Sequence, residues 1–209
     1  MTIRFLVAIL LSLAALAGCE PSDRRPMRGL LRCTPMPIPE DMSRSLDVPA
    51  PFPSRGFLLE YRGSSPRIEL HAVQWHRGTE ATSSHSETVV DGPLATELAF
   101  GVRDERDQTG GLHSEHRIAE RDRRPASADK RPIGGSTTKD VGREDRAIKG
   151  RAWRVLESRG PVEATLGQEA VLCAILIGGD PKDDDRVPPG ERVRQVDDAW
   201  ILSVRMQEK

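Results

Sequence analysis

The sequence predicts a mainly β protein, in which a single antiparallel β-sandwich-like domain with a long charged insertion follows a proline-rich tether. Three observations predict this fold class. Apolar and polar residues alternate over several short segments, prolines crowd into residues 20–56, and residues 103–150 are highly charged. Alternation with a period of two is typical of strands that are buried on one face. We therefore expect three parts, residues 1–18, 19–56 and 57–209.

The first part has the character of an export signal. A single positive charge at Arg4 is followed by an uncharged apolar run of 13 residues from Phe5 to Ala17. A transmembrane helix needs about 20 apolar residues, whereas the apolar region of a signal peptide needs only about 7 to 15. The run therefore predicts a signal peptide over residues 1–18.

The end of this run reads Leu16, Ala17, Gly18 and Cys19, or LAGC. These four residues resemble the lipobox of bacterial lipoproteins. The resemblance implies cleavage before Cys19, lipid attachment to its thiol and acylation of the new amino terminus with fatty acids such as palmitate. Two or more acyl chains hold a protein stably at a membrane. Glu20 stands where lipoproteins retained in the inner membrane often have Asp, so the resemblance favours the outer membrane.

Charge and location together narrow the expected partners. The formal net charge is −1, with 31 basic and 32 acidic residues, so no overall field attracts nucleic acid. A lipid anchor implies a place in the cell envelope, facing the periplasm or the surface. The expected partners are the membrane, through the anchor, and an envelope protein or polymer.

The second part, residues 19–56, is predicted to be a tether. It holds eight of the chain's 16 prolines. Proline fixes φ and removes a hydrogen-bond donor, which suits neither a helix nor a central strand. We expect a semi-extended tether in which the apolar pieces GLLRC and MPIP are able to dock on the domain.

The third part contains the predicted strands. Alternation and punctuation by turn residues place them at 57–61, 68–76, 87–90, 94–102, 151–157, 169–177 and 199–206. The segment AVLCAILI, residues 170–177, is apolar on both faces. This pattern fits a strand covered on each side or a short buried helix, and we favour the strand.

Residues 103–150 interrupt this pattern with charged side chains and little apolar content. Such a stretch cannot bury enough apolar surface to offset its conformational entropy. We expect a long mobile insertion with a short strand around 113–119.

Two cysteines remain besides Cys19. An exported protein meets an oxidising compartment, where Cys33 and Cys173 would be able to form a disulfide. The alternative is that Cys173 is a small apolar core residue and Cys33 an exposed thiol. The sequence leaves both open.

The five histidines fall between residues 71 and 116, and imidazole is a common ligand of Zn²⁺ and Cu²⁺. Their spacing argues against a shared site, because residues five apart on a strand face opposite sides. We expect no cofactor and no metal. The candidate ligands, should a site exist, are His71, His85, His113 and His116.

Other chemical motifs are weak. The loop GGDPKDDDRVPPG lacks the alternation and the glycine of a calcium loop, and no GxSxG or SxxK nucleophile motif occurs. Trp75, Trp153 and Trp200 lie on predicted strands, where core packing is their usual role. The sequence therefore favours a binding or assembly-supporting module without enzymatic activity. Two alternatives stay open, an envelope hydrolase whose site forms only in the fold and a periplasmic metal-binding protein.

Overall fold

The structure, a computed structural model, describes residues 29–63, 67–89, 93–106, 108, 110–123, 147–158, 160–178 and 193–207. The strands are β1 (Leu31–Met36), β2 (Ser54–Tyr61), β3 (Arg67–His76), β4 (Thr79–Val89), β5 (Leu94–Arg106), β6 (Leu112–Asp122), β7 (Trp153–Glu157), β8 (Val162–Ala164), β9 (Glu169–Ile177) and β10 (Asp198–Gln207). The α-helix α2 (Glu40–Leu46) and the 3-10 helix η1 (Val193–Gln195) complete the described elements.

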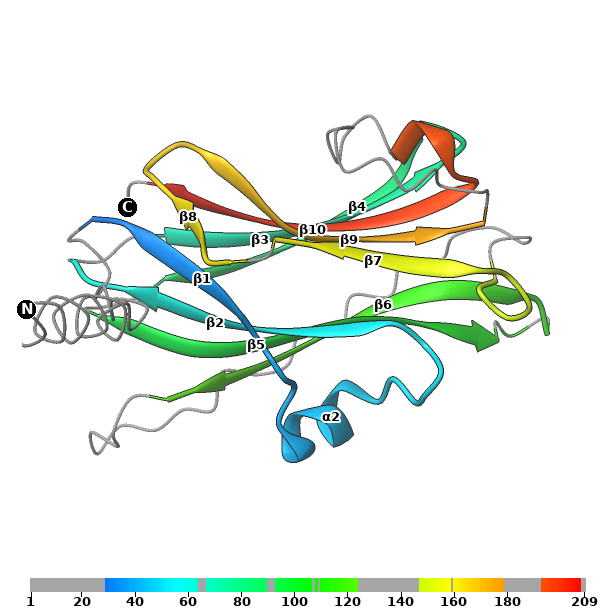
Figure 1. The fold of residues 1–209 in the computed structure, drawn as a ribbon, viewed down its shortest axis with the longest axis horizontal. Helices are drawn as coiled ribbons and strands as arrows, with labels where there is room; N and C mark the ends of the chain where they lie inside the picture. Colours follow the sequence, from blue (N-terminus) through cyan, green and yellow to red (C-terminus); the bar gives the residue numbers. More distant parts are fainter. Residues whose placement is uncertain are drawn as a thin grey trace, which may run out of the picture.

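The strands form two antiparallel five-stranded sheets that lie face to face (Figure 1). The first sheet has the order β6-β5-β2-β1-β8 and the second has the order β4-β3-β10-β9-β7. The predicted fold class, a mainly β sandwich-like domain, is therefore confirmed.

The core lies between the sheets and consists of the inward side chains of both. Large residues that are almost fully buried there include Phe57, Phe100, Ile175, Trp200 and Leu202. Each comes from a strand whose alternate residues face inward, which is the arrangement expected for packed antiparallel sheets.

The segment AVLCAILI forms strand β9, as the sequence analysis favoured. Ile175 and Ile177 lie in the main core, whereas Ala174 and Leu176 belong to a second cluster on the outer face of the sheet. That cluster is completed by residues of η1 and its neighbours. The strand is thus apolar on both sides because both sides are covered.

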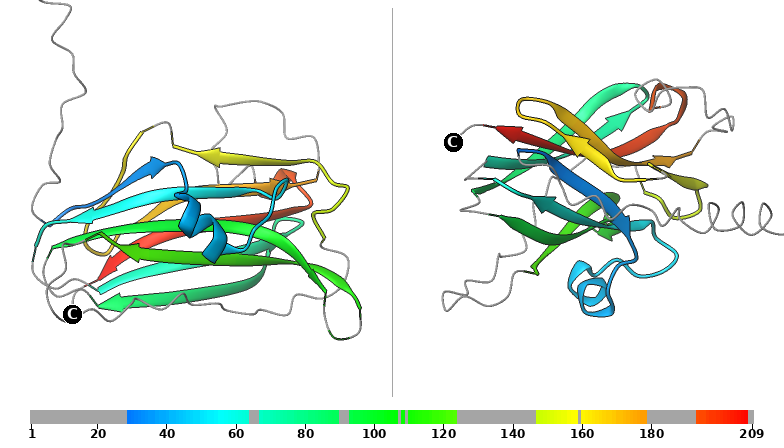
Figure 2. Two further views of the ribbon diagram at one scale, coloured as in Figure 1. Left: turned by 90° about the horizontal axis from the view of Figure 1, so that it is seen from below. Right: turned by 60° about the vertical axis from the view of Figure 1, so that its left-hand side comes forward.

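The outer face of the first sheet is covered by α2. Met42 and Leu46 of the helix pack on Ala99 and Ala119 of β5 and β6. Figure 2 shows α2 on the side of this sheet that faces away from the second sheet. The small alanines leave room for a helix to approach the sheet closely.

Three boundaries differ from the sequence prediction. Residues 31–36 and 40–46, expected in the tether, form β1 and α2. Strand β1 is an inner strand of the first sheet because it pairs with β2 and β8, and its alternate residues Leu31 and Cys33 enter the core. Prolines are tolerated at its end and beyond, where fewer ladder hydrogen bonds are required.

The expected insertion is also shorter within the described residues. Strand β5 continues to Arg106, and β6 spans Leu112–Asp122 where only a short strand was expected. Residues 124–146 of the expected insertion lie outside the described part.

Strand β4 was predicted only at its end. Residues 77 and 78 form a two-residue turn with φ of 49° and 75°, and His76 pairs with Thr79 across it. A turn with two positive φ angles joins antiparallel strands with the right twist. Thr79, Glu80, Ala81 and Ser83 of this edge strand are exposed, so its sequence lacks the alternation that reveals a half-buried strand.

Candidate functional site

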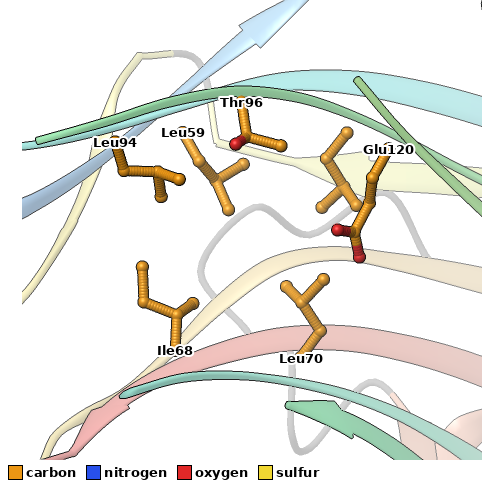
Figure 3. Close-up of a pocket in the computed structure, with 7 residues that line it drawn as sticks. Leu59, Ile68, Leu70, Leu94, Thr96 and Glu120 are labelled. Carbon is orange, nitrogen blue, oxygen red and sulfur yellow. The ribbon is translucent and has the colours of Figure 1, made fainter. Parts of the chain in front are cut away.

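An apolar pocket opens between the two sheets at one end of the sandwich. Its walls come from β2, β3, β5 and β6, and they consist of five aliphatic side chains, one hydroxyl and one carboxyl: Leu59, Ile68, Leu70, Leu94, Leu98, Thr96 and Glu120. Figure 3 shows Ile68 and Leu70 pointing toward the side chains of the opposite sheet. We call this site the inter-sheet pocket.

The pocket exists because two inward positions carry short or polar side chains. Thr96 lies two residues before Leu98 on β5, and Glu120 of β6 pairs with Leu98. Elsewhere on these inward faces the chain has large apolar residues such as Phe100 and Ile118. Since Thr and Glu do not fill the space between the sheets as those residues do, a hollow remains.

Both polar groups of the pocket lack a compensating partner. Thr96 is 5% exposed, and its Oγ1 has no hydrogen-bond partner among the described residues. Burial raises the pKa of the Glu120 carboxyl above its ordinary value of 4.5, and no described charge or hydrogen bond offsets this effect. A buried polar group without a partner is costly, so such groups point to an occupant that is missing from the protein itself.

The pocket is slim. Its empty volume is about 300 Å³ with the open mouth included, and only a small part of it is wide enough to hold water. This enclosed part has room for about one or two waters. The end of an unbranched alkyl chain fits such a space better than a ring does.

The opposite end of the sandwich has a polar core. Ser114 Oγ of β6 accepts hydrogen bonds from Gln74 Nε2 at 3.1 Å and from Trp200 Nε1 at 3.3 Å. The ring of His116 lies 4.8 Å from the Trp200 ring, measured between centroids. All four side chains are buried. Ser114 and His116 come from β6 of the first sheet, whereas Gln74 and Trp200 come from β3 and β10 of the second, so this cluster joins the two sheets.

A charged network lies at the same end. His76 Nδ1 lies 2.7 Å from Asp198 Oδ1, and Arg151 Nη1 donates to Asp198 Oδ2 at 2.6 Å. Arg151 Nη2 also donates to the backbone oxygen of Ile177 at 3.3 Å. Asp198 is buried, and both partners of its carboxyl group, His76 and Arg151, are partly exposed. The network fixes the start of β10 against β3 and the segment before β7.

Asp104 holds the segment before β7 in place at this end of the core. Its Oδ1 accepts from the backbone N–H of Ile148 at 2.6 Å, and its Oδ2 accepts from that of Lys149 at 2.8 Å. These bonds hold the Ile148 side chain, which is 2% exposed, in the main core.

The candidate metal ligands do not converge in the described part of the chain. His71 lies on β3 with Nε2 3.3 Å from Glu69 Oε2, and its Cα is paired with that of His85 on β4. His113 and His116 lie on β6, in the first sheet, and alternate in the face they present. No group of three or more His, Cys, Asp or Glu side chains suited to a metal ion occurs among the described residues.

The two core cysteines are free thiols in the structure. Cys33 lies in β1 and Cys173 in β9, and both are buried in the main cluster between the sheets. Burial raises the pKa of each thiol to about 12. Cys173 is therefore an apolar core residue, as the second interpretation expected. Cys33 is also buried, whereas that interpretation expected an exposed thiol.

Of the three tryptophans, Trp200 is fully buried in the core, Trp75 packs on the outer cluster of the second sheet and Trp153 is 39% exposed. Trp75 therefore lies on the opposite face of the second sheet from Trp200. Cys19 and the acidic loop at 180–185 lie outside the described residues. No helix among the described residues is long and apolar enough to cross a bilayer.

Sequence reasoning missed Thr96 and Glu120, the polar residues of the inter-sheet pocket. Thr96 did carry a signal, because it is the one polar residue in the inward series that runs through Leu94, Leu98 and Phe100. Glu120 carried none, since its segment was assigned to the charged insertion.

We compared the chain with models of known protein families, with curated proteins and with solved structures, and none of them matched. The proposals below therefore rest on the residues themselves.

Proposed function

We propose that this protein is a lipid-anchored component of a bacterial cell envelope whose β-sandwich is a binding module. The anchor is supported by the lipobox-like LAGC that ends at Cys19. The binding function is carried by one observation, the inter-sheet pocket. Its aliphatic walls and two uncompensated polar groups are the composition typical of small-molecule sites.

The proposed anchor limits how far the sandwich can lie from the membrane. Strand β1 begins at Leu31, and Cys19 precedes it by 12 residues. A fully extended chain of that length spans at most about 40 Å. With lipid on Cys19, the domain therefore works close to the bilayer, where it meets envelope proteins, polymers and amphiphilic molecules.

Metabolic labelling tests the anchor. Cells that express the protein are fed a clickable fatty acid, and the chain is compared with its Cys19→Ser variant. We expect label only on the parent chain and a larger apparent mass for the uncleaved variant. Absence of label from both chains, with equal mobility, would remove the anchor from the proposal.

Membrane fractionation tests the location. We expect the lipidated protein in the outer membrane of a two-membrane bacterium and the Glu20→Asp variant in the inner membrane. Crosslinking in cells and recovery of the lipidated protein then test for a bound envelope protein or polymer. Equal distribution of both chains between the two membranes contradicts the sorting part of the proposal.

A second candidate function, an envelope hydrolase, is favoured by the pair His76 and Asp198. A buried carboxylate that holds one imidazole nitrogen leaves the other nitrogen free to act as a general base. The His76 side chain is 32% exposed, so that nitrogen is within reach of solvent. Hydrolysis of simple esters that is lost in His76→Gln, with the fold intact, would support this second function, and the same rate in both chains would exclude it for those esters.

A further inference from the structure

The inter-sheet pocket places one acidic group beside aliphatic walls, with no described cation next to it. The lining contains five leucine or isoleucine side chains besides Thr96 and Glu120. Ionisable side chains are seldom buried without a partner. The carboxyl of Glu120 either stays protonated in this site or receives a positive charge from outside the protein.

Thr96 gives a second, independent indication. Thr96 lines the pocket, and its Oγ1 is buried and has no hydrogen-bond partner among the described residues. Figure 3 shows the Thr96 and Glu120 side chains entering the pocket from the same sheet. A hydroxyl can accept a hydrogen bond as well as donate one, so a hydroxyl and a carboxyl both line one apolar space.

From this arrangement we propose that the inter-sheet pocket binds a small primary alkylamine as its ammonium ion. The ammonium has three donors and no acceptor, which complements the Glu120 carboxylate and the lone pairs of the Thr96 hydroxyl. Its hydrogen bonds go to Glu120 and to Thr96 Oγ1. The first methylene groups lie against Leu59, Ile68 and Leu70, and the rest of the chain leaves through the mouth.

The shape of the pocket supports an unbranched chain. The empty volume is about 300 Å³ with the open mouth included, but the part wide enough for water holds about one or two molecules. An ammonium with its first methylenes is among the thinnest organic cations, and a ring or a branched head group is wider. Burial of each methylene favours binding.

The charge of the Glu120 carboxyl favours an ammonium over other head groups on the same alkyl chain. A carboxylate head would meet the like charge of the Glu120 carboxyl. An alcohol head would form hydrogen bonds but would not balance the charge. The ammonium is favoured because it does both.

The inference rests on the proposed binding function, and its test is separate from the test of the anchor. The full chain carrying Cys19→Ser has no acyl group of its own that competes for the pocket. Binding of n-hexylamine, 1-hexanol and hexanoate to this chain is measured by calorimetry and by shifts of labelled Ile and Leu methyl signals. We expect n-hexylamine to bind at least about tenfold more tightly than 1-hexanol, hexanoate not to bind, and shifts at Ile68 and Leu70.

Two near-isosteric variants test the named groups. Glu120→Gln should weaken n-hexylamine binding by about tenfold or more, and Thr96→Val by a few-fold. Glu163→Gln removes the same charge from an exposed position on β8 at the far edge of the sheet, so it should leave binding unchanged. If Glu120→Gln and Glu163→Gln behave alike, the ammonium is not recognised by Glu120 and the proposal is wrong.

The dependence on pH gives a further readout. Ammonium binding requires ionised Glu120, whose pKa is raised by burial. The pocket lining has no other titratable side chain, and Asp122 stands exposed beside it. Affinity should therefore fall as the pH drops through the pKa of Glu120, and this dependence should vanish in Glu120→Gln. No binding of n-hexylamine at any pH, or equal binding of all three probes, overturns the proposal.

Discussion

His76 and Asp198 face each other across the pairing of β3 with β10, with Nδ1 of His76 2.7 Å from Oδ1 of Asp198. Asp198 is 1% exposed and also accepts a hydrogen bond from Arg151. A buried carboxylate is tolerated where it is paired and hydrogen-bonded. This network therefore joins three segments that are far apart in the sequence.

Replacing Asp198 with Asn tests the network. The variant keeps the shape of the side chain but loses the charge that both donors face. We expect a loss of about 2 kcal/mol in the free energy of unfolding, because hydrogen bonds to charged groups contribute about 1.5–3 kcal/mol. Urea unfolding measures it. Asp197→Asn is the matched control, since Asp197 also approaches Arg151 but its side chain is 58% exposed. If Asp198→Asn and Asp197→Asn lower the free energy of unfolding equally, burial of Asp198 does not strengthen its contribution to stability.

Replacing Ser114 with Ala tests the polar core. The variant leaves Gln74 Nε2 and Trp200 Nε1 without their acceptor inside the sandwich. We expect a loss of about 1–3 kcal/mol in the free energy of unfolding. Adding Gln74→Leu should recover part of it, because one unpaired group is then removed. Ser45→Ala, on an exposed face of α2, should change the free energy by less than about 0.5 kcal/mol; a Ser114→Ala effect that small would contradict the assignment.

Replacing Glu120 with Gln tests the acidic group of the inter-sheet pocket in the absence of ligand. Since burial raises its pKa in the folded protein, the folded state holds the proton to a higher pH than the unfolded state. This group's contribution to stability is therefore complete below its ordinary pKa of 4.5 and is lost as the pH rises through the raised pKa. We expect Glu120→Gln to gain stability relative to the parent chain over that window. Urea unfolding at a series of pH values checks this, and a difference that stays constant with pH would refute it.

The cysteines allow a chemical test of the core. In the Cys19→Ser chain, Cys33 and Cys173 remain, and burial holds the pKa of each at about 12. Because the thiolate is the reactive form, we expect neither to react with a thiol reagent in the folded protein and both to react after unfolding in denaturant. Failure of either to react after unfolding, without reductant, would show that the two are joined by a disulfide.

The strands were predictable where one face of a segment is buried. In β10, inward Trp200, Leu202 and Val204 alternate with the outward residues between them, and this period of two is visible in the sequence. Strand β4 was missed over most of its length because it lies at an edge. Its described side chains are exposed and are under no pressure to alternate.

The candidate sites were less predictable, because a site is formed by residues from several strands. His76 and Asp198 are separated by 121 residues, and no local pattern relates them. The register of β3 with β10 brings them together. Glu120 likewise belongs to a charged segment whose inward face became visible only through the pairing of β5 with β6.

The sequence by itself determined the mainly β fold class, the candidate export signal and the LAGC motif, since each depends on the order of residues along a short stretch. The tertiary structure alone decided that residues 31–46 belong to the domain, that Cys33 and Cys173 are buried thiols, and that Thr96 and Glu120 share a pocket. These facts depend on which strands pair and in which register, and the free energy that selects this pairing comes from the burial of both sheets' inward faces against each other.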